Sequence, residues 1–169
     1  GHLCYRLTDV PPQPNSPPDC VSDVSLSDML NAVEANQPIA TLILDTSMNS
    51  LTFYKYKGTL LDGRDSAFLT PSALARSAKY AIKHGDTLAI FLPLDVTLQS
   101  LFEPRHFLPQ TLVKTELTDG VLSIYQEGPD DNMSLDRDFK FVIIVRSDEI
   151  PDWAHEFIGH GRLRVIRIV

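Results

Sequence analysis

Apolar residues in this chain gather in short runs with few polar positions, and these runs alternate with segments of helical spacing. Three runs have the length of a buried strand, at residues 39–44, 87–92 and 139–145. A strand that is apolar on both faces is typical of a parallel sheet covered by helices on each side. The pattern predicts neighbouring parallel strands with these residues buried: Leu42, Ile43, Leu88, Ile90, Val142, Ile143 and Ile144.

The clearest helical signal lies between the first two runs, at residues 71–84. Thr70 is a favourable N-cap residue, Pro71 suits the first helical position, and Gly85 can end the helix. An apolar stripe at helical spacing predicts that this helix packs on one face of the sheet. The stripe consists of Leu74, Ala75, Ala78 and Ile82.

Weaker patterns complete the order of elements. They predict short helices around residues 26–33, 97–102 and 151–158, and strands at 59–61 and 163–169. Residues 50–57 have the aromatic content of a strand but also fit a short helix. Alternating strands and helices imply right-handed crossovers. The predicted fold class is therefore α/β, with a three-layer parallel sheet and helices on both faces.

An insertion is predicted before the third run. Residues 111–126 alternate about Asp119-Gly120, which is the strongest two-residue hairpin signal in a sequence. Residues 128–137 have the composition of an acidic loop. We therefore expect an inserted β-hairpin that projects from the parallel sheet.

The first residues differ from the rest in composition. Five prolines between residues 8 and 19 preclude a helix there. We assign residues 1–24 to a proline-rich linker or strap and residues 25–169 to one α/β domain. Cys4 and Cys20 flank the prolines, and the sequence leaves open whether they form a disulfide. Two cysteines in a chain of 169 residues do not make a disulfide scaffold, so we expect both to be reduced.

The formal net charge of the chain is −7, which argues against binding to nucleic acid because phosphate backbones repel an acidic surface. No apolar run approaches the roughly 20 residues that span a bilayer. The first ten residues contain Arg6 and Asp9 and lack the apolar core of a signal peptide. We therefore expect a cytoplasmic chain whose partners are proteins.

The motifs that carry common chemistries are missing. The sequence contains neither G-x-x-x-x-G-K-[ST] nor G-x-G-x-x-G, so no glycine-rich loop can cradle a phosphate. No G-x-S-x-G elbow presents a nucleophilic serine. We expect no cofactor and no enzymatic activity, although a small hydrolase with dispersed catalytic residues stays as an alternative.

His155-Glu156-x-x-x-His160 resembles the helix motif of zinc proteases, but its histidines are five residues apart instead of four. On a helix this spacing turns the two rings roughly 140° apart, so we expect no metal site. Acidic pairs such as Asp130-Asp131 and Asp148-Glu149 are expected in solvated loops.

One candidate interface remains near the end of the chain. Three arginines alternate imperfectly with apolar residues along the last predicted strand, and a tryptophan precedes them. Arginine and tryptophan are frequent at protein interfaces. The candidate residues are Trp153, Arg162, Arg164 and Arg167.

The order of segments over residues 38–169 resembles a late AAA+ module of a dynein heavy chain. Two similar segments are residues 38–45, a strand that ends in Asp, and residues 80–90, where Ala-Ile-x-x-Gly leads into a strand. Further similar segments are residues 135–145 and the Ile-Pro at 150–151. The apolar residues Leu98, Leu101, Phe102 and Leu112 match a leucine-rich stretch of the family. The resemblance implies an AAA+-like fold and a cytoplasmic, cytoskeletal or axonemal location.

The sequence departs from an active AAA+ module at two places. Leu92-Pro93-Leu94 stands where an acidic pair would end the Walker B strand, and Arg146-Ser147 stands at the sensor position. The resemblance therefore implies a non-catalytic structural module that braces or transmits conformational change without nucleotide. The alternative is a free-standing interaction domain that docks partners by a sheet edge or the proline-rich segment.

Overall fold

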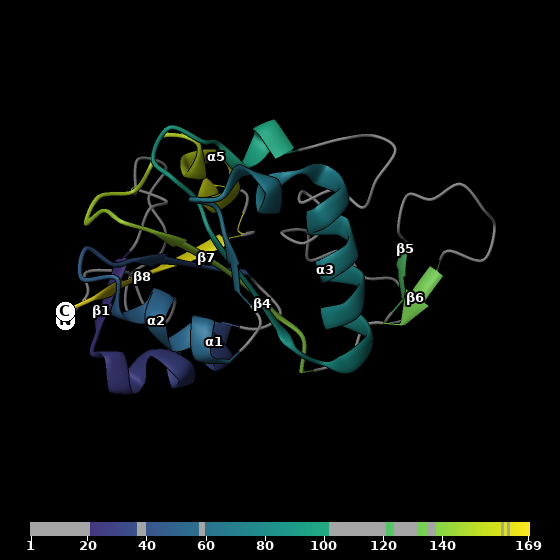
Figure 1. The fold of residues 1–169 in the computed structure, drawn as a ribbon. Coiled ribbons are helices and arrows are strands. Elements are labelled where there is room, and N and C mark those ends of the chain that lie inside the picture. The colour runs from purple at the N-terminus through teal and green to yellow at the C-terminus, as the bar shows by residue number, and fades with distance from the viewer. Residues whose placement is uncertain are drawn as a thin grey trace.

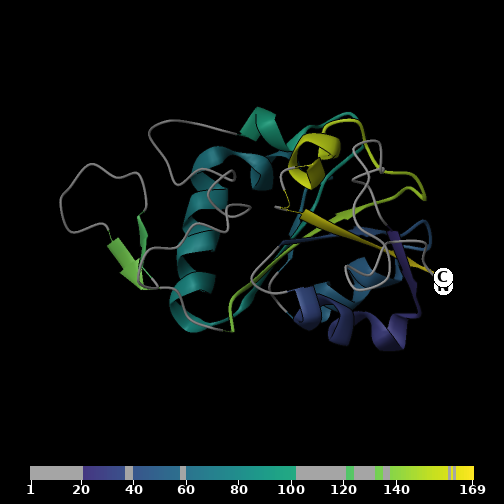
Figure 2. The ribbon, with the colours of Figure 1, turned by 180° about the vertical axis from the view of Figure 1, so that it is seen from behind.

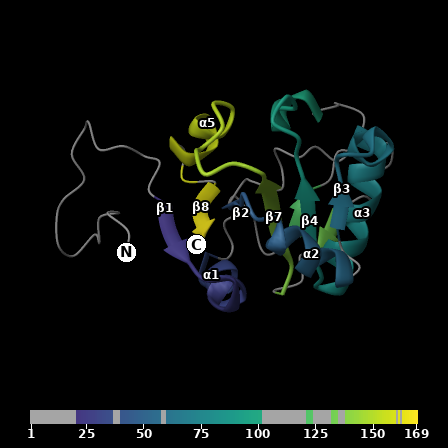
Figure 3. The same cartoon turned by 60° about the vertical axis from the view of Figure 1, so that its left-hand side comes forward.

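A computed structural model of the chain describes residues 21–36, 40–57, 60–101, 121–123, 132–134, 138–159, 161 and 163–169. Its centre is a six-stranded sheet in which all neighbouring strands are parallel. The strands lie in the order β1-β8-β2-β7-β4-β3, as Figure 3 shows. Their bounds are β1 Val21–Val24, β2 Ala40–Leu44, β3 Leu60–Asp62, β4 Thr87–Phe91, β7 Lys140–Val145 and β8 Leu163–Ile168.

Helices cover both faces of this sheet (Figure 1). On one face, α1 (Met29–Asn36) and α2 (Asn49–Tyr56) bury Met29, Val33 and Tyr54 against the strands. On the other face, α3 (Pro71–His84) and α5 (Ala154–Gly159) form a larger core. Short 3-10 turns complete the connections: η1 Leu26–Asp28, η2 Ser66–Leu69 and η3 Leu98–Leu101. The predicted three-layer α/β class is confirmed.

The interior strands are buried as their composition predicts. All seven residues chosen from the three apolar runs have at most 2% of their surface exposed. Ile143 of β7 stands opposite Leu42 of β2 on one side and Ile90 of β4 on the other. Covered strands of this kind account for the double-sided apolar pattern that the sequence displays.

Local chemistry explains why α3 has the bounds that the sequence predicts. The Thr70 hydroxyl accepts a hydrogen bond from the Ala73 N–H at 3.2 Å, and Pro71 occupies the first turn. Gly85 ends the helix with φ of 69°, a left-handed conformation that favours glycine. Leu74, Ala78 and Ile82 are fully buried against the sheet. All of these predictions are confirmed.

Three segments differ from expectation. In the ambiguous segment, for which both strand and helix were open, residues 50–56 are helical in α2; Leu51 and Tyr54, one turn apart, are both buried, and Tyr54 packs against the sheet. Residues 21–24, expected in the proline-rich strap, form β1 and pair with β8. No local pattern announces β1, since its four residues are all half-buried.

An antiparallel pair is present in the insertion, but it joins the second half of the predicted hairpin to a later segment. β5 (Val121–Ser123) pairs with β6 (Asn132–Ser134), which lies in the segment predicted as an acidic loop. Figure 2 shows this pair standing apart from the parallel sheet, beyond α3. Asp119-Gly120 and residues 111–118 lie outside the described residues.

None of the helices that the structure describes has both the length and the apolar composition of a membrane span.

Tyr54 offers a test of the α2 face. Its side chain is 1% exposed, its hydroxyl has no hydrogen-bond partner among the described residues, and burial raises the pKa of Tyr54 to about 12. A buried hydroxyl without a partner costs free energy, so we expect Tyr54→Phe to leave the free energy of unfolding unchanged or raise it by up to ~1 kcal/mol. Urea denaturation measures the difference, with the exposed Tyr56→Phe as control. A loss of stability in Tyr54→Phe would contradict this account.

Candidate functional site

The carboxyl ends of the central strands are the first place to look for a site. The connection after β2 runs through α2 on one face, whereas the connection after β7 runs through α5 on the other. In open α/β sheets, ligands bind in the crevice where neighbouring connections diverge in this way. Asp45 sits at this point, with its N–H bonded to the Val145 carbonyl at 3.0 Å.

The Asp45 carboxylate fills the N-terminal end of α2. One oxygen, Oδ1, accepts from the Ser47 and Met48 N–H groups at 3.0 and 3.2 Å and from the Ser47 hydroxyl at 2.5 Å. The other, Oδ2, accepts from the Ser50 N–H at 2.8 Å and the Ser50 hydroxyl at 2.6 Å. Met48 turns to φ of 65°, a strained conformation for a residue other than glycine, where the loop closes around the carboxylate.

The charge of Asp45 is stabilised where it lies. Burial raises the pKa of the carboxyl group, but the hydrogen bonds from Ser47 and Ser50 outweigh this effect and leave the pKa below its ordinary value. The group is therefore an anion that is almost fully buried, at 1% exposure. Backbone N–H groups at a helix N-terminus are the groups that hold phosphates in nucleotide-binding proteins. Here the chain supplies its own anion.

This arrangement leads to a prediction about nucleotides. The Asp45 carboxylate occupies the donors at the start of α2, and the sequence has no glycine-rich loop to provide others. Ligand binding to the native state raises stability by mass action. We therefore expect no change in the thermal midpoint with millimolar Mg-ATP or Mg-ADP, relative to magnesium chloride alone. A reproducible rise of several degrees would refute the prediction.

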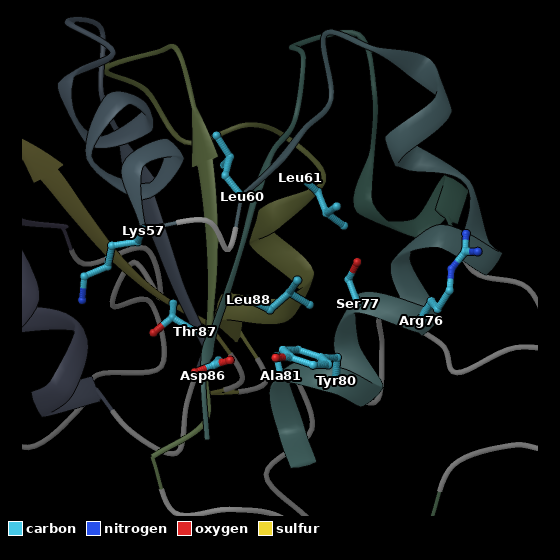
Figure 4. Close-up of a pocket in the computed structure, with 10 residues that line it drawn as sticks. All are labelled: Lys57, Leu60, Leu61, Arg76, Ser77, Tyr80, Ala81, Asp86, Thr87 and Leu88. Carbon is cyan, nitrogen blue, oxygen red and sulfur yellow. The ribbon is translucent and has the colours of Figure 1, made fainter. Parts of the chain in front are cut away.

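A groove lies at the opposite end of the sheet, between the end of α2 and α3 (Figure 4). Its volume is about 470 Å³, within the range of roughly 300–1,000 Å³ typical of ligand sites. Its apolar lining is Leu60, Leu61, Ala81 and Leu88. The groove is open at one side, since β3 ends the sheet and has no outer neighbour among the described strands.

Charged side chains lie on opposite sides of the groove. Lys57 comes from the end of α2 and Arg76 from α3, with Leu88 between them in Figure 4. Neither cation has a carboxylate partner among the described residues, although the Lys57 ammonium lies 5.5 Å from the Phe53 ring centre. Asp86 is the acidic residue of the described lining. The groove thus has an apolar floor and a mainly basic rim.

A second hollow adjoins the groove through Leu60. It has a volume of about 300 Å³ and is lined by Lys55, Leu60, Asp62 and Phe68. Asp62 is already paired with Arg64 at 2.5 Å, and this hydrogen bond holds the pKa of the Asp62 carboxyl below its ordinary value. Edge strand β3 therefore contributes residues to both hollows, and a lysine lies in the lining of each.

The predicted interface residues do not form one exposed patch. Trp153 is 9% exposed and lies within the core, where its ring packs edge-on to the Phe157 ring with the ring centres 6.3 Å apart. Arg167 donates to the Asp23 carboxylate at 3.1 Å, which ties β8 to β1. Arg164 is exposed, and Arg162 lies outside the described residues. An interface role for these residues stays a prediction.

The histidines, cysteines and acidic pairs that the sequence singles out are not brought together into one site among the described residues. His155 lies on α5, whereas His160, Cys4, Cys20 and Asp130-Asp131 lie outside the described residues. Within the ranges that the structure describes, no three side chains of His, Cys, Asp or Glu are placed to hold a metal ion. The sequence analysis missed the groove, because Lys57, Arg76 and Leu88 come from separate elements with no common motif. A signal was present in the sequence of α3, which contains basic residues but no acidic ones.

Comparisons with known proteins give a family model and two yeast relatives. A family model described as "RRT15: Regulator of rDNA transcription protein 15" matches residues 1–49. The ART2 protein of Saccharomyces cerevisiae is 90% identical over 21 residues, which are 12% of this chain and 34% of ART2. The regulator of rDNA transcription protein 15 of the same yeast is 94% identical over 17 residues, 10% of this chain and 27% of that protein. The chain thus spans about a third or less of these relatives.

These matches contradict the resemblance to a dynein heavy chain. That resemblance rested on an order of segments that unrelated parallel α/β proteins share, so the fold can be right while the family is wrong. The structural role in a dynein-like chain and the cytoplasmic, cytoskeletal or axonemal location depended on it and are corrected with it. The AAA+-like form of the fold is not confirmed. The family match covers 49 of 169 residues and includes β1 and β2 but not the groove.

Proposed function

We propose that the α/β domain is a protein-interaction module that binds an extended segment of a partner protein in the groove between α2 and α3. The observation that carries the proposal is an open groove beside an edge strand, with an apolar floor and rim cations that have no carboxylate partner in the described part of the chain. The proposal includes no catalytic step and no cofactor.

The geometry suits an extended chain. Peptides that bind at sheet edges place alternate side chains in pockets on either face of the edge strand. β3 contributes residues to both the groove of about 470 Å³ and the hollow of about 300 Å³. Leucine side chains on the floor gain from burial, roughly 25 cal/mol for each Å² of apolar surface removed from water.

Selection from a random peptide library on the full chain tests the proposal. The selected peptide is then measured by fluorescence anisotropy against two variants of α3. Ser77→Trp places a large ring in the groove, and Ser72→Trp places the same ring on the same helix outside the lining. We expect at least about a tenfold loss of affinity in Ser77→Trp only, as for a blocked central contact.

Two outcomes would overturn the proposal. One is a library that yields no peptide above background, and the other is a selected peptide whose affinity Ser77→Trp leaves unchanged. Circular dichroism of both variants checks that the fold survives, since Ser77 is half-buried.

A second candidate function is regulation of rDNA transcription in the nucleus, which the family match at residues 1–49 favours. The full chain and a variant without residues 1–20 would be expressed with a fluorescent tag, and precursor rRNA synthesis measured by pulse labelling. A nuclear signal and a change in synthesis that both depend on residues 1–20 support this candidate. An unchanged rate with the full chain opposes it.

A further inference from the structure

Two helical stretches beside the groove are basic although the chain carries a net charge of −7 and the groove lining includes Asp86. From Asn49 to Lys57 and from Pro71 to Gly85 there is no acidic residue. The same stretches contain five cations, Lys55, Lys57, Arg76, Lys79 and Lys83. A local excess of this kind in an acidic chain selects partners of opposite charge.

We propose that the partner segment is acidic, with carboxylates that pair with Lys57 and Arg76 across the groove. This inference rests on the proposed function, since it names the chemistry of the segment that the groove binds. Arginine and lysine form charge-assisted hydrogen bonds with carboxylates, and such bonds are the strong ones in polar recognition.

An exposed stripe on α3 continues the basic surface beyond the groove. Arg76, Tyr80 and His84 are spaced four residues apart, so they lie on one side of the helix, and Lys83 adjoins them. All four are exposed, and Tyr80 has 61% of its surface in solvent. Arg76 and Tyr80 belong both to the groove lining and to this stripe. A bound segment can therefore leave the groove along the stripe.

The two rings of the stripe are held in place. The His84 ring stacks on Tyr80 with centres 4.2 Å apart, and Nδ1 of His84 lies 2.9 Å from the Tyr80 carbonyl oxygen. Because a carbonyl only accepts, Nδ1 carries the proton and the ring is fixed in one orientation. The stacked pair is an aromatic surface between Arg76 and Lys83 against which the side chains that flank the carboxylates can pack.

An acidic protein segment fits this surface better than a nucleic acid. The floor consists of aliphatic side chains, Leu60, Leu61 and Leu88, and the aromatic surface of the described stripe is limited to the Tyr80–His84 pair, whereas single-stranded nucleic acids stack successive bases on aromatic side chains along a cationic channel. The cations cover two short stretches of an acidic protein, and the long phosphate backbone would meet the remaining negative charge. Aliphatic side chains with interspersed carboxylates satisfy both the floor and the rim.

The test uses the full chain and three fluorescein-labelled probes. The first is a twelve-residue peptide in which leucine alternates with glutamate, the second has glutamine for every glutamate, and the third is a single-stranded DNA of mixed sequence. We expect the glutamate peptide to bind about tenfold more tightly than the glutamine peptide at low salt. The advantage should shrink as ionic strength rises, because salt screens exposed charges.

Charge reversals locate the contact. Arg76→Glu and Lys57→Glu are each expected to lower the affinity for the glutamate peptide at least about tenfold. The affinity for the glutamine peptide should fall by less than about twofold. Arg146→Glu is the matched control, since Arg146 is exposed at the opposite end of the sheet and undergoes the same change of charge. Its affinity for the glutamate peptide should stay within about twofold.

Each contrary result has a distinct meaning. Equal binding of the two peptides, equal losses in Arg146→Glu and Arg76→Glu, tighter binding of the DNA, or no binding of either peptide would overturn the acidic partner. The proposed function itself fails only if library selection yields no peptide that Ser77→Trp blocks.

Discussion

Truncating Ile143 to alanine is expected to lower the free energy of unfolding by about 2–5 kcal/mol. Ile143 is fully buried in β7, between β2 and β4, and belongs to the larger core beneath α3 and α5. The substitution removes apolar contacts and leaves a cavity that a central strand cannot fill by moving, because its hydrogen bonds fix it on both sides.

Urea denaturation followed by circular dichroism measures the loss. Leu94→Ala is the control, since Leu94 has 64% of its surface exposed and its truncation should change stability by less than about 0.5 kcal/mol. A cost below about 1 kcal/mol for Ile143→Ala would contradict this account. It would mean that neighbouring side chains fill the cavity or that Ile143 does not lie in the centre of the core.

Removing the Asp45 carboxylate is expected to cost about 2–3 kcal/mol, because Asp45→Ala leaves buried donors on Ser50 and the loop without an acceptor. Asp45→Asn should cost nearly as much, since its amide nitrogen would face the donors that now meet an oxygen. Ser47→Ala removes one exposed hydroxyl and should cost far less.

The Asp45 contribution depends on pH with a definite sign. The pKa of the carboxyl is lower in the folded state than its ordinary value of 3.8. The stabilisation is therefore fully present above that value and is lost as the pH falls through the lower, folded pKa. In denaturation series from neutral to acidic pH, we compare the free energy of unfolding of the natural chain with that of Asp45→Asn. The difference between the two should decrease only below about pH 4. A gap that is constant down to strongly acidic pH would show that ionisation of Asp45 contributes nothing.

Local signals in the sequence determine much of this fold. The bounds of α3 follow from Thr70 and Gly85, each of which has one strong conformational preference. The parallel sheet follows from strands such as β2, where every residue is buried and only a double-sided cover can achieve this. The helical state of residues 49–56 did not follow, because Asp45 and the sheet beneath decide it and composition does not.

Pairings between distant segments were out of reach of local signals. β1 is held by β8, and β6 is matched to β5 where composition indicated a loop. The groove was missed for the same reason, since its rim joins Lys57 to Arg76 across two intervening elements. The candidate arginine Arg167 has a structural partner in Asp23, 144 residues away in the sequence. Spacing along a chain carries no information about such contacts.

The order of strands also constrains how the chain folds as it is synthesised. β8 lies between β1 and β2, so β1 has no strand to pair with until residues 163–168 have left the ribosome. During translation the nascent chain must carry β1 and the outer side of β2 as bare edges, and such edges promote association between chains. A chaperone that covers these two segments until β8 is available would act on strands that are synthesised before their partner and paired only after it.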